Sequence, residues 1–457
     1  MKKLSFSCAI CFLFMLSSTV FVSAAETSRI SMKYNTNGEE PDDSSYWVSI
    51  SSSGQHTVFN SRATDLVSPA DTLSNDDIFL YDRSTNMTER VSVKYNTSAG
   101  EPDSFSTYPS VSADGRYVVF NSGATDLVNP PDSLGNSDVF LRDRVAGSTE
   151  RISVNTSGGE PDNWSSNPSV SADGRYVVFD SGATDLVSPS DSLSHGDVFL
   201  RDRVSGTTER VSVKYNTSAG EPDGYSSNPS VSADGRYVVF QSSATDLVNP
   251  SDSLSQTDIF LRDRVVGSTE RISVNTNGGE PNNYSSQSSI SANGRYIVYL
   301  SFASDLVDND NNGQNDVFIY DRILQTTERV NVNDAGEEAN GQTSTYGGAA
   351  LSSDGRYVAF TSSATNLVEN DNNAAPDVFR RDRKIGKVIR NSVNTNGEEV
   401  SGASPYNVEM SANGRFIVFG STANDLVEPN DPGTTTDIFM RAEDKEFYWP
   451  LFLNKKK

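Results

Sequence analysis

One motif recurs seven times along this chain, at a spacing of about sixty residues. Its clearest form, S-A-D-G-R-Y-V-V-F, begins at Ser112, Ser171 and Ser232, and related strings begin at Ser51, Ser291, Ser352 and Ser411. The spacings alternate between 61 and 59 when counted at the residue before each glycine, namely Ser53, Asp114, Asp173, Asp234, Asn293, Asp354 and Asn413. Seven copies of one unit indicate a repeat architecture, although 457 residues alone would suggest about three domains.

Each unit reads as four short strands without helical periodicity. In the second unit, Asp114-Gly115 is a hairpin turn, and the strands are predicted at residues 109–112, 116–120, 138–143 and 149–154. Strands that are apolar on both faces must be covered on both faces, and four-stranded sheets stacked around a ring cover each other. The sequence therefore predicts an all-β, seven-bladed β-propeller of four-stranded antiparallel blades, spanning residues 26–441.

The strand count indicates how the ring closes. The seventh unit lacks a fourth strand, and the segment Ser28–Lys33 matches that strand without three strands before it. We therefore expect the N-terminal strand to close the propeller, with residues 29–33 paired with residues 437–441. Such closure hides the strand edges that an open array would expose.

The repeat resembles a known family. S-x-D-G-R-Y-V-x-F followed by D-[VI]-F-x-x-D-R is similar to the WD40-like PD40 repeats of TolB-type propellers, over essentially the whole predicted mature chain. The units differ from that family in having Ala or Ser before Asp-Gly and in their longer loops. The resemblance implies the fold, while the superfamily includes scaffolds, binding modules and non-catalytic domains of peptidases.

Residues 1–25 have the pattern of a secretory signal peptide. Lys2 and Lys3 precede an apolar run from Leu4 to Val22, and small residues follow up to Ala25. A signal anchor is the alternative. Both cysteines lie within this segment, so the mature protein would have no disulfide. We expect a secreted protein, extracellular, at the cell surface or periplasmic.

Residues 442–457 lie outside the repeat. Their aromatic and proline-containing run ends in three lysines and is too short to span a membrane. It resembles the endings of some exported bacterial proteins, which implies cell-surface attachment; packing against the rim of the propeller is the alternative.

Acidic residues dominate the long loops. Lys plus Arg number 37 against 61 Asp plus Glu, a net charge of −24 without a basic block, which argues against a nucleic-acid partner.

In a four-stranded meander, the loop between the second and third strands and the loop between blades leave the same face, which we name the long-loop face. Each unit carries two acids six residues apart there: Asp71 and Asp77, Asp132 and Asp138, Asp191 and Asp197, Asp252 and Asp258, Asp310 and Asp316, Asp371 and Asp377, Asp431 and Asp437. Such a field attracts cations or a basic partner; the alternative is solvated acids that cap local backbone amides.

One of these loops has the pattern of a calcium loop. In the fifth unit, oxygen-bearing side chains alternate from Asp308 to Asp316 around Gly313. We expect Asp308, Asp310, Asn312, Gln314 and Asp316 to bind one Ca²⁺ ion. Ile319 stands where an EF-hand would have Glu, so a further ligand would have to come from elsewhere.

An aromatic residue recurs in the loops between blades, at Phe105, Trp164, Tyr225, Tyr284, Tyr346 and Tyr406. Aromatic rings beside acids suit the stacking of a carbohydrate or a cationic peptide. The alternative is that each ring packs over a blade junction.

Catalytic motifs are weak. The two histidines lie in unlike places, and no nucleophile elbow precedes a helix. We therefore predict a monomeric, non-catalytic binding or scaffold propeller for protein or carbohydrate partners. The alternative is a carbohydrate-active enzyme that uses two carboxylates of the long-loop face.

Overall fold

The computed structural model describes residues 25–443, except residues 37, 191, 193–194, 252, 254–255, 345–346, 374, 405 and 429–434. The predicted signal peptide up to residue 24 and the tail from residue 444 lie outside the described residues. So do four residues named above: Asp191, Asp252, Tyr346 and Asp431.

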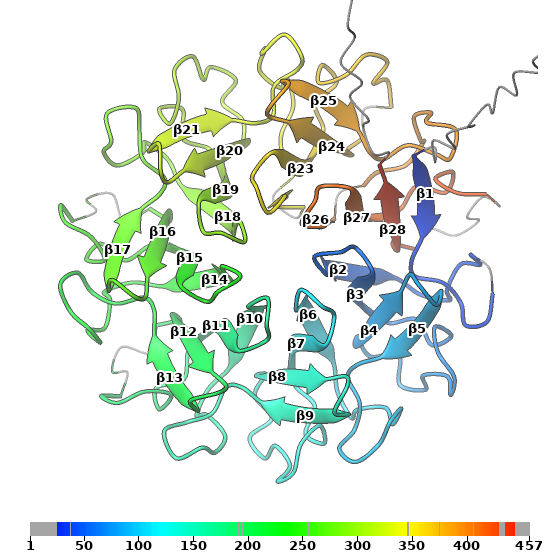
Figure 1. The fold of residues 1–457 in the computed structure, drawn as a ribbon, viewed down its shortest axis with the longest axis vertical. Helices are drawn as coiled ribbons and strands as arrows, with labels where there is room; N and C mark the ends of the chain where they lie inside the picture. Colours follow the sequence, from blue (N-terminus) through cyan, green and yellow to red (C-terminus); the bar gives the residue numbers. More distant parts are fainter. Residues whose placement is uncertain are drawn as a thin grey trace, which may run out of the picture.

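Seven four-stranded antiparallel sheets form a closed ring around a central channel (Figure 1). Blade 1 contains β2 (Ser45–Ile50), β3 (His56–Ser61), β4 (Asp77–Asp82) and β5 (Met87–Arg90). Blade 2 contains β6 (Ser106–Val111), β7 (Tyr117–Ser122), β8 (Asp138–Asp143) and β9 (Ser148–Arg151). Blade 3 contains β10 (Ser165–Val170), β11 (Tyr176–Ser181), β12 (Asp197–Asp202) and β13 (Thr207–Arg210). Blade 4 contains β14 (Ser226–Val231), β15 (Tyr237–Ser242), β16 (Asp258–Asp263) and β17 (Ser268–Arg271).

Blade 5 contains β18 (Ser285–Ile290), β19 (Tyr296–Ser301), β20 (Asp316–Asp321) and β21 (Thr326–Arg329). Blade 6 contains β22 (Ala349–Leu351), β23 (Tyr357–Ser362), β24 (Asp377–Asp382) and β25 (Lys387–Arg390). Blade 7 contains β26 (Val408–Met410), β27 (Phe416–Ser421), β28 (Asp437–Ala442) and, from the other end of the chain, β1 (Glu26–Arg29). The predicted seven-bladed propeller is confirmed. None of the described residues belongs to a helix long and apolar enough to cross a membrane.

The N-terminal strand closes the ring, as predicted, but its register differs from the prediction. Strand β1 pairs with β28 from Glu26 opposite Ala442 to Arg29 opposite Phe439, whereas we expected residues 29–33 to form the strand. The apolar residue that follows, Ile30, is only 1% exposed and belongs to the core between the last and first blades. The regular strand therefore ends where the chain turns into the next blade.

The core lies between neighbouring blades. The apolar side chains Val58, Ile78 and Leu80 of blade 1 pack with Val118 and Phe120 of blade 2, and equivalent clusters follow around the ring. Because both faces of each sheet are buried in this way, the second and third strands of each unit are almost wholly apolar.

Contacts on the face opposite the long loops explain why the motif recurs in each blade. Arg116 donates to both carboxylate oxygens of Asp143, at 2.9 and 2.7 Å. Arg203 of the next blade lies over the ring of Tyr117, 4.7 Å from its centroid. A Cβ on Gly174 would lie 2.1 Å from that ring, so the aspartate-glycine turn needs glycine for contact as well as for its φ of +73°.

Candidate functional site

The innermost strand of a blade carries a bulge at one recurring position. In blade 2, Thr107 pairs with Asn121 and Ser110 with Val119, so Tyr108 and Pro109 together face a single residue of β7. A β-bulge of this kind turns a side chain away from its normal face and often lies next to a functional site. Register shifts occur at the same place in blades 1 to 5.

The bulged residues adopt a left-handed backbone conformation. Trp47 and Tyr108 have φ values of 40° and 53°, which is unusual for large side chains. The equivalent residues Asn167, Asn228, Gln287 and Gly348 also have positive φ. Asparagine and glycine accept this conformation readily, whereas a bulky residue there costs of order 1–3 kcal/mol and must be held by its surroundings.

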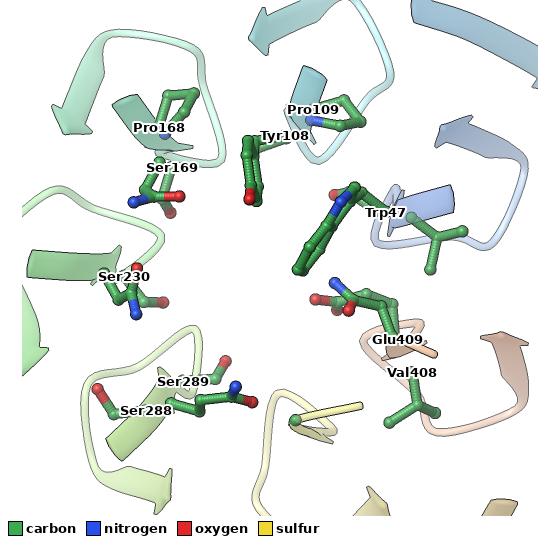
Figure 2. Close-up of a pocket in the computed structure, with 18 of the residues that line it drawn as sticks. Trp47, Tyr108, Pro109, Pro168, Ser169, Ser230, Ser288, Ser289, Val408 and Glu409 are labelled. Atoms are coloured by element: carbon green, nitrogen blue, oxygen red, sulfur yellow. The ribbon is translucent and has the colours of Figure 1, made fainter. Parts of the chain in front are cut away.

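These side chains line a cavity of about 430 Å³ in the central channel. In Figure 2, Trp47 and Tyr108 point into the channel from adjacent blades. Their ring centroids lie 4.6 Å apart at an interplanar angle of 42°. Asn167, Asn228 and Gln287 line the cavity elsewhere, and the sixth blade contributes only Gly347, Gly348 and Ala349. The cavity is therefore chemically asymmetric, although the ring that encloses it is regular.

A second ring of equivalent residues lies two positions further along the same strands. Five blades have serine there, at Ser49, Ser110, Ser169, Ser230 and Ser289, and the sixth has Ala350. The backbone N–H of Val111 points toward the Ser49 hydroxyl at 3.3 Å, so this serine links neighbouring blades. The seventh blade has Glu409 at this position, on the channel wall beside Trp47 in Figure 2.

Glu409 is the one acid among the described residues that line this cavity, and it forms no ion pair with any of them. The surrounding protein desolvates the carboxyl and raises its pKa to about 7, although part of the residue still faces the channel. Behind the wall, burial also raises the pKa of Asp180 to about 7. The Asp180 carboxylate accepts a long bond of 3.4 Å from the N–H of Asn228, so it supports the neighbouring bulge.

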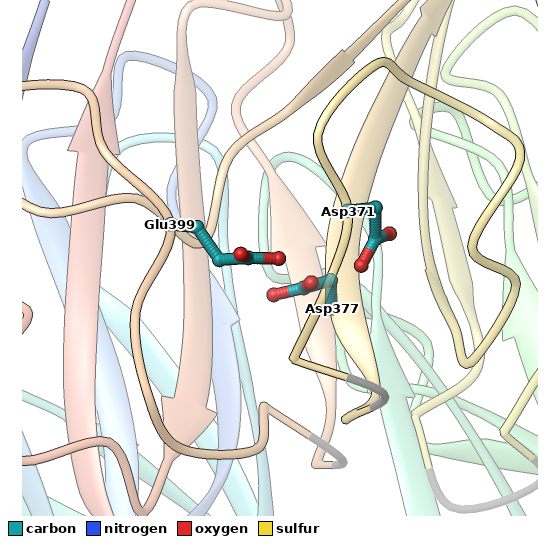
Figure 3. Close-up of side chains that lie close together, drawn as sticks. All are labelled: Asp371, Asp377 and Glu399. Atoms are coloured by element: carbon teal, nitrogen blue, oxygen red, sulfur yellow. The ribbon is translucent and has the colours of Figure 1, made fainter.

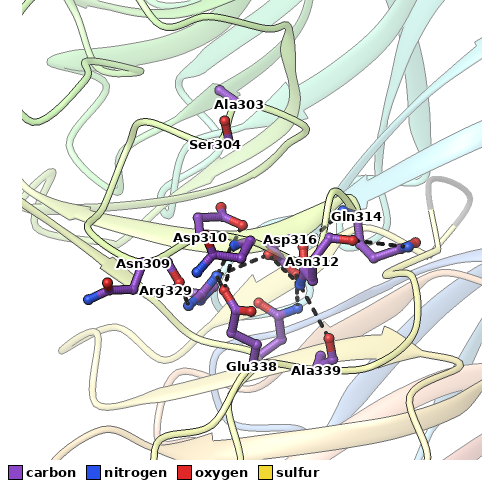
Figure 4. A network of polar contacts seen from close by, with 12 residues as sticks. Ala303, Ser304, Asn309, Asp310, Asn312, Gln314, Asp316, Arg329, Glu338 and Ala339 are labelled. Carbon is purple, nitrogen blue, oxygen red and sulfur yellow. Dashed lines mark hydrogen bonds and ion pairs between the residues drawn. The ribbon is translucent and has the colours of Figure 1, made fainter.

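Two of the five residues predicted to bind calcium, Asp310 and Asp316, lie beside an arginine (Figure 4). Arg329 Nη1 is 3.2 Å from Asp310, 3.5 Å from Asp316 and 2.7 Å from Glu338. Burial, followed by the charge of Asp316, raises the pKa of Asp310 to about 6 despite the opposing effect of Arg329.

The remaining members of the predicted calcium set have other roles. Asn312 donates its amide to both oxygens of Asp316, at 3.2 and 3.0 Å, and its carbonyl accepts the N–H of Gln314 at 2.9 Å. Asp308 is exposed. The structure thus brings Asp310, Asn312 and Asp316 together around an internal cation. This arrangement does not fit a calcium ion between the carboxylates, and calcium binding stays a prediction.

The sixth blade repeats this cluster with three carboxylates close enough to share a metal, those of Asp371, Asp377 and Glu399 (Figure 3). Arg390 Nη1 lies among them, at 3.6, 3.1 and 2.6 Å respectively. A guanidinium group therefore occupies the position that a metal ion would need.

The same arginine recurs in the other blades. Arg90 contacts Asp71 at 3.0 Å and Asp77 at 3.3 Å, and Arg151 contacts Asp132 and Asp138 at 3.2 and 3.1 Å. The glutamate of the next loop is also engaged, because the N–H of Leu73 donates to Glu101 at 2.6 Å and that of Leu134 to Glu160 at 2.6 Å. Many acids of the long-loop face are thus bonded within the protein.

Of the predicted ligand-face aromatics, Trp164 and Tyr225 lie near each other, because a Cβ added to Gly196 would be 3.4 Å from the first ring and 3.5 Å from the second. Phe105, Trp164, Tyr225 and Tyr284 are 38–59% exposed, each on its own blade. Phe105 covers Gly123 and Trp164 covers Gly182, where an added Cβ would lie 3.0 Å from each ring. Tyr225 contacts His195 and Tyr284 contacts Phe302, with centroids 4.9 and 5.0 Å apart. Phe105 and Tyr284 thus cap their own blades, whereas Trp164 and Tyr225 flank Gly196 together.

Sequence reasoning missed the channel residues, although a signal was present. Blades 3 and 4 share the strand S-S-N-P-S-V, whereas blade 2 has S-T-Y-P-S-V and blade 1 has S-Y-W-V-S-I. In otherwise similar units, Trp47 and Tyr108 therefore stand at the position where blades 3 and 4 have asparagine.

Comparison with known proteins identifies the fold. No family model and no curated protein matches the sequence. The β-propeller domain of the Trilobed protease from Pyrococcus furiosus, which has an open velcro topology, matches with a TM-score of 0.52 at 13% identity, over 91% of this chain and 99% of that chain. Oligogalacturonate lyase from Vibrio parahaemolyticus matches with a TM-score of 0.51 at 13% identity, over 92% and 97%. TolB from Acinetobacter baumannii gives a TM-score of 0.39 at 14% identity, over 77% of this chain and only 64% of that one.

Proposed function

We propose that this chain is an exported, non-catalytic binding propeller whose ligand enters the central channel from the long-loop face. The observation that carries the proposal is the set of bulged residues, which direct Trp47 and Tyr108 into a cavity of about 430 Å³. Pockets of roughly 300–1,000 Å³ with a few placed polar groups are typical of small-molecule sites.

The fold itself does not require these two rings. Asn167 and Asn228 occupy the same bulge in blades of nearly identical sequence. A tryptophan and a tyrosine at positive φ cost of order 1–3 kcal/mol each, and such strain is concentrated at functional sites. Their presence therefore supports a role in binding.

The alternative of a carbohydrate-active enzyme has less support. Most glycoside hydrolases use a pair of carboxyl groups roughly 5–10 Å apart. The described lining of the cavity contributes Glu409 alone, and many carboxylates of the long-loop face are engaged by arginines. Binding without catalysis is the function that this arrangement favours.

Export and partners complete the proposal. The signal-like residues 1–25 favour a location outside the cytoplasm. The exposed rim rings, among them Trp164 and Tyr225, are suited to contact a protein or carbohydrate partner at the mouth of the channel. In this proposal the protein acts as a monomer, and the tail from residue 442 attaches it to the cell surface.

Binding measurements on the mature protein test the channel. A panel of glycans, small amines and peptides is screened by calorimetry against the wild type, the double variant Trp47→Ala/Tyr108→Ala and the rim variant Trp164→Ala. We expect the double variant to lose the ligand found with the wild type and the rim variant to keep it. Retention by the double variant and loss by Trp164→Ala would place the site on the rim and contradict the proposal.

A further inference from the structure

We infer that the channel ligand is a compact cation, a small molecule with an ammonium group that contacts the rings of Trp47 and Tyr108 and the carboxylate of Glu409. This inference rests on the proposed function, because it names the ligand class of the same site. It is argued from the charge of the lining, the aromatic pair and the shape of the channel.

The lining contains an acid without a counter-charge. Glu409 and the phenol of Tyr108 are the titratable groups among the described lining residues, and no lysine, arginine or histidine is among them. Elsewhere in the molecule, buried carboxylates such as Asp316 and Asp377 are held by an arginine. A charge removed from water is costly unless it is paired, so a cationic ligand would supply what the protein lacks here.

The glutamate is also not required by the fold. Five blades have serine at the equivalent position and one has Ala350. Since the ring accepts these small residues six times, the seventh blade gains no packing that demands a carboxylate. The substitution of an acid is therefore best explained by what enters the channel.

The aromatic pair provides the second half of a cation site. An ammonium group over the face of a tryptophan or tyrosine gains roughly 0.5–2 kcal/mol, most when it is desolvated. The two rings of Trp47 and Tyr108 meet at 42° and form a corner on one side of the cavity. A neutral sugar could stack on the same rings and donate a hydroxyl hydrogen bond to Glu409, but it would leave the carboxylate without a counter-charge, so the observations favour the cation.

The rest of the cavity limits the size and polarity of the ligand. Amides of Asn167 and Asn228 offer hydrogen bonds to hydroxyl or carbonyl groups. Beyond Glu409, the apolar side chains Ile50 and Met410 belong to a second, smaller cavity of about 170 Å³. The site is therefore suited to a short polar body with its ammonium group near the level of Glu409. The net charge of −24 raises the local concentration of cations around the molecule.

Binding should depend on pH through Glu409. Its pKa of about 7 means that a large part of the carboxyl is protonated near neutrality without a ligand. Of the strands packed against β26, β2 contributes Tyr46 and β23 contributes Tyr357, while β22 and β27 contribute no titratable group. None of them brings a second acid or a cation to Glu409. Affinity for an ammonium ligand should therefore fall by about thirtyfold between about pH 8 and pH 5.5, as the carboxylate takes up a proton.

Fluorine NMR of the mature chain labelled with fluorotryptophan tests this inference directly. The full sequence has three tryptophans, and Trp47→Phe assigns the channel signal. Choline is titrated beside its uncharged carbon isostere, dimethylbutanol, and beside glucose. We expect choline to shift the Trp47 signal to saturation, with at least tenfold weaker binding of the isostere, and the Trp164 signal to stay unchanged.

Two variants of Glu409 separate charge from folding. Glu409→Gln keeps the size of the side chain and should weaken choline binding at least tenfold at high pH and remove its pH dependence. Glu409→Ser introduces the residue found in five other blades, so it should fold normally and show the same loss.

The outcomes distinguish this inference from the proposed function. If the isostere binds as tightly as choline, or if glucose shifts the Trp47 signal and choline does not, the cationic ligand is wrong while the channel site stands. If no amine, glycan or peptide of the panel shifts the Trp47 signal, the channel is not a binding site and both proposals fail.

Discussion

Replacing Arg390 with methionine tests whether an internal cation holds the carboxylates of the long loops. The guanidinium lies 2.6–3.6 Å from Asp371, Asp377 and Glu399, and its side chain is 8% exposed. Methionine keeps much of the length of the side chain but removes the charge. Three carboxylates then face each other without a counter-ion.

The expected loss follows from the cost of an unpaired buried charge. Removing one partner of such a cluster costs about 3–5 kcal/mol. At ~2.1 cal/mol/K per residue, a propeller of this length has an unfolding entropy of about 0.9 kcal/mol/K, so the melting temperature should fall by about 3 to 6 °C. Burial and the neighbouring carboxylates already raise the pKa of Asp371 to about 6, from 3.8, against the opposing effect of Arg390. Because the folded state then binds more protons than the unfolded state, stability falls as pH rises through this interval, and the loss should be larger at pH 8 than at pH 5.

Calcium provides the decisive assay. Once Arg390 is removed, the three oxygens within 4.8 Å of one another become a set of hard-cation ligands. Calcium at a hundredfold its dissociation constant should restore about 2.7 kcal/mol of the loss. The variant should gain more stability from calcium than the wild type does. Lys387→Met, which removes an exposed cation from the same strand, should behave like the wild type. A wild type stabilised by calcium, with a variant that loses no stability, would refute the internal-cation explanation and favour a native metal site.

Three further predictions concern the fold. Deleting residues 26–31 exposes the edge of β28 and should lower both the melting temperature and the solubility, measured by calorimetry and light scattering. Gly174→Ala forces a Cβ to 2.1 Å from the ring of Tyr117 and should destabilise the protein by more than about 2 kcal/mol in urea, whereas Gly158→Ala, also at positive φ but with no atom within 4 Å, should show only the smaller strain of about 1 kcal/mol. An arginine lowers the pKa of Asp143 to about 2, so its contribution is present above about pH 4 and lost as pH falls toward 2. Asp143→Asn should therefore be less stable than the wild type at pH 5 and nearly equal to it at pH 2, and a constant difference would contradict this.

Much of the fold could be predicted because its determinants are local. The aspartate-glycine turns and the apolar second and third strands repeat with the period of the blade, and each is defined by neighbouring residues. The closing strand shows where this reasoning fails. Its apolar residues suggested a strand at Ser28–Lys33, but Ile30 is apolar because it packs between two blades and not because it continues β1.

The arginine clusters could not be predicted from spacing alone. Arg90 and Asp77 are thirteen residues apart in the sequence, and the pairing of Arg90 with Phe79 across β4 and β5 brings them together. Considered within one loop, the acids suggested a calcium loop or a solvated face. When the whole blade is considered, these acids contact an arginine, and that arginine is the last residue of the recurring T-E-R string.

The channel shows why a single acid can matter more than many acids on the rim. The charges of the exposed loops act through water, where salt screens them beyond about 8 Å at physiological ionic strength. Glu409 lies inside the ring of blades, where the effective dielectric constant is lower and the same charge interacts several times more strongly. Since the bulged strands direct Trp47 and Tyr108 into that space, these irregular side chains lie where a charge interacts more strongly than on the exposed rim. A regular ring thus supports a few irregular side chains, and the proposed binding specificity rests on these residues.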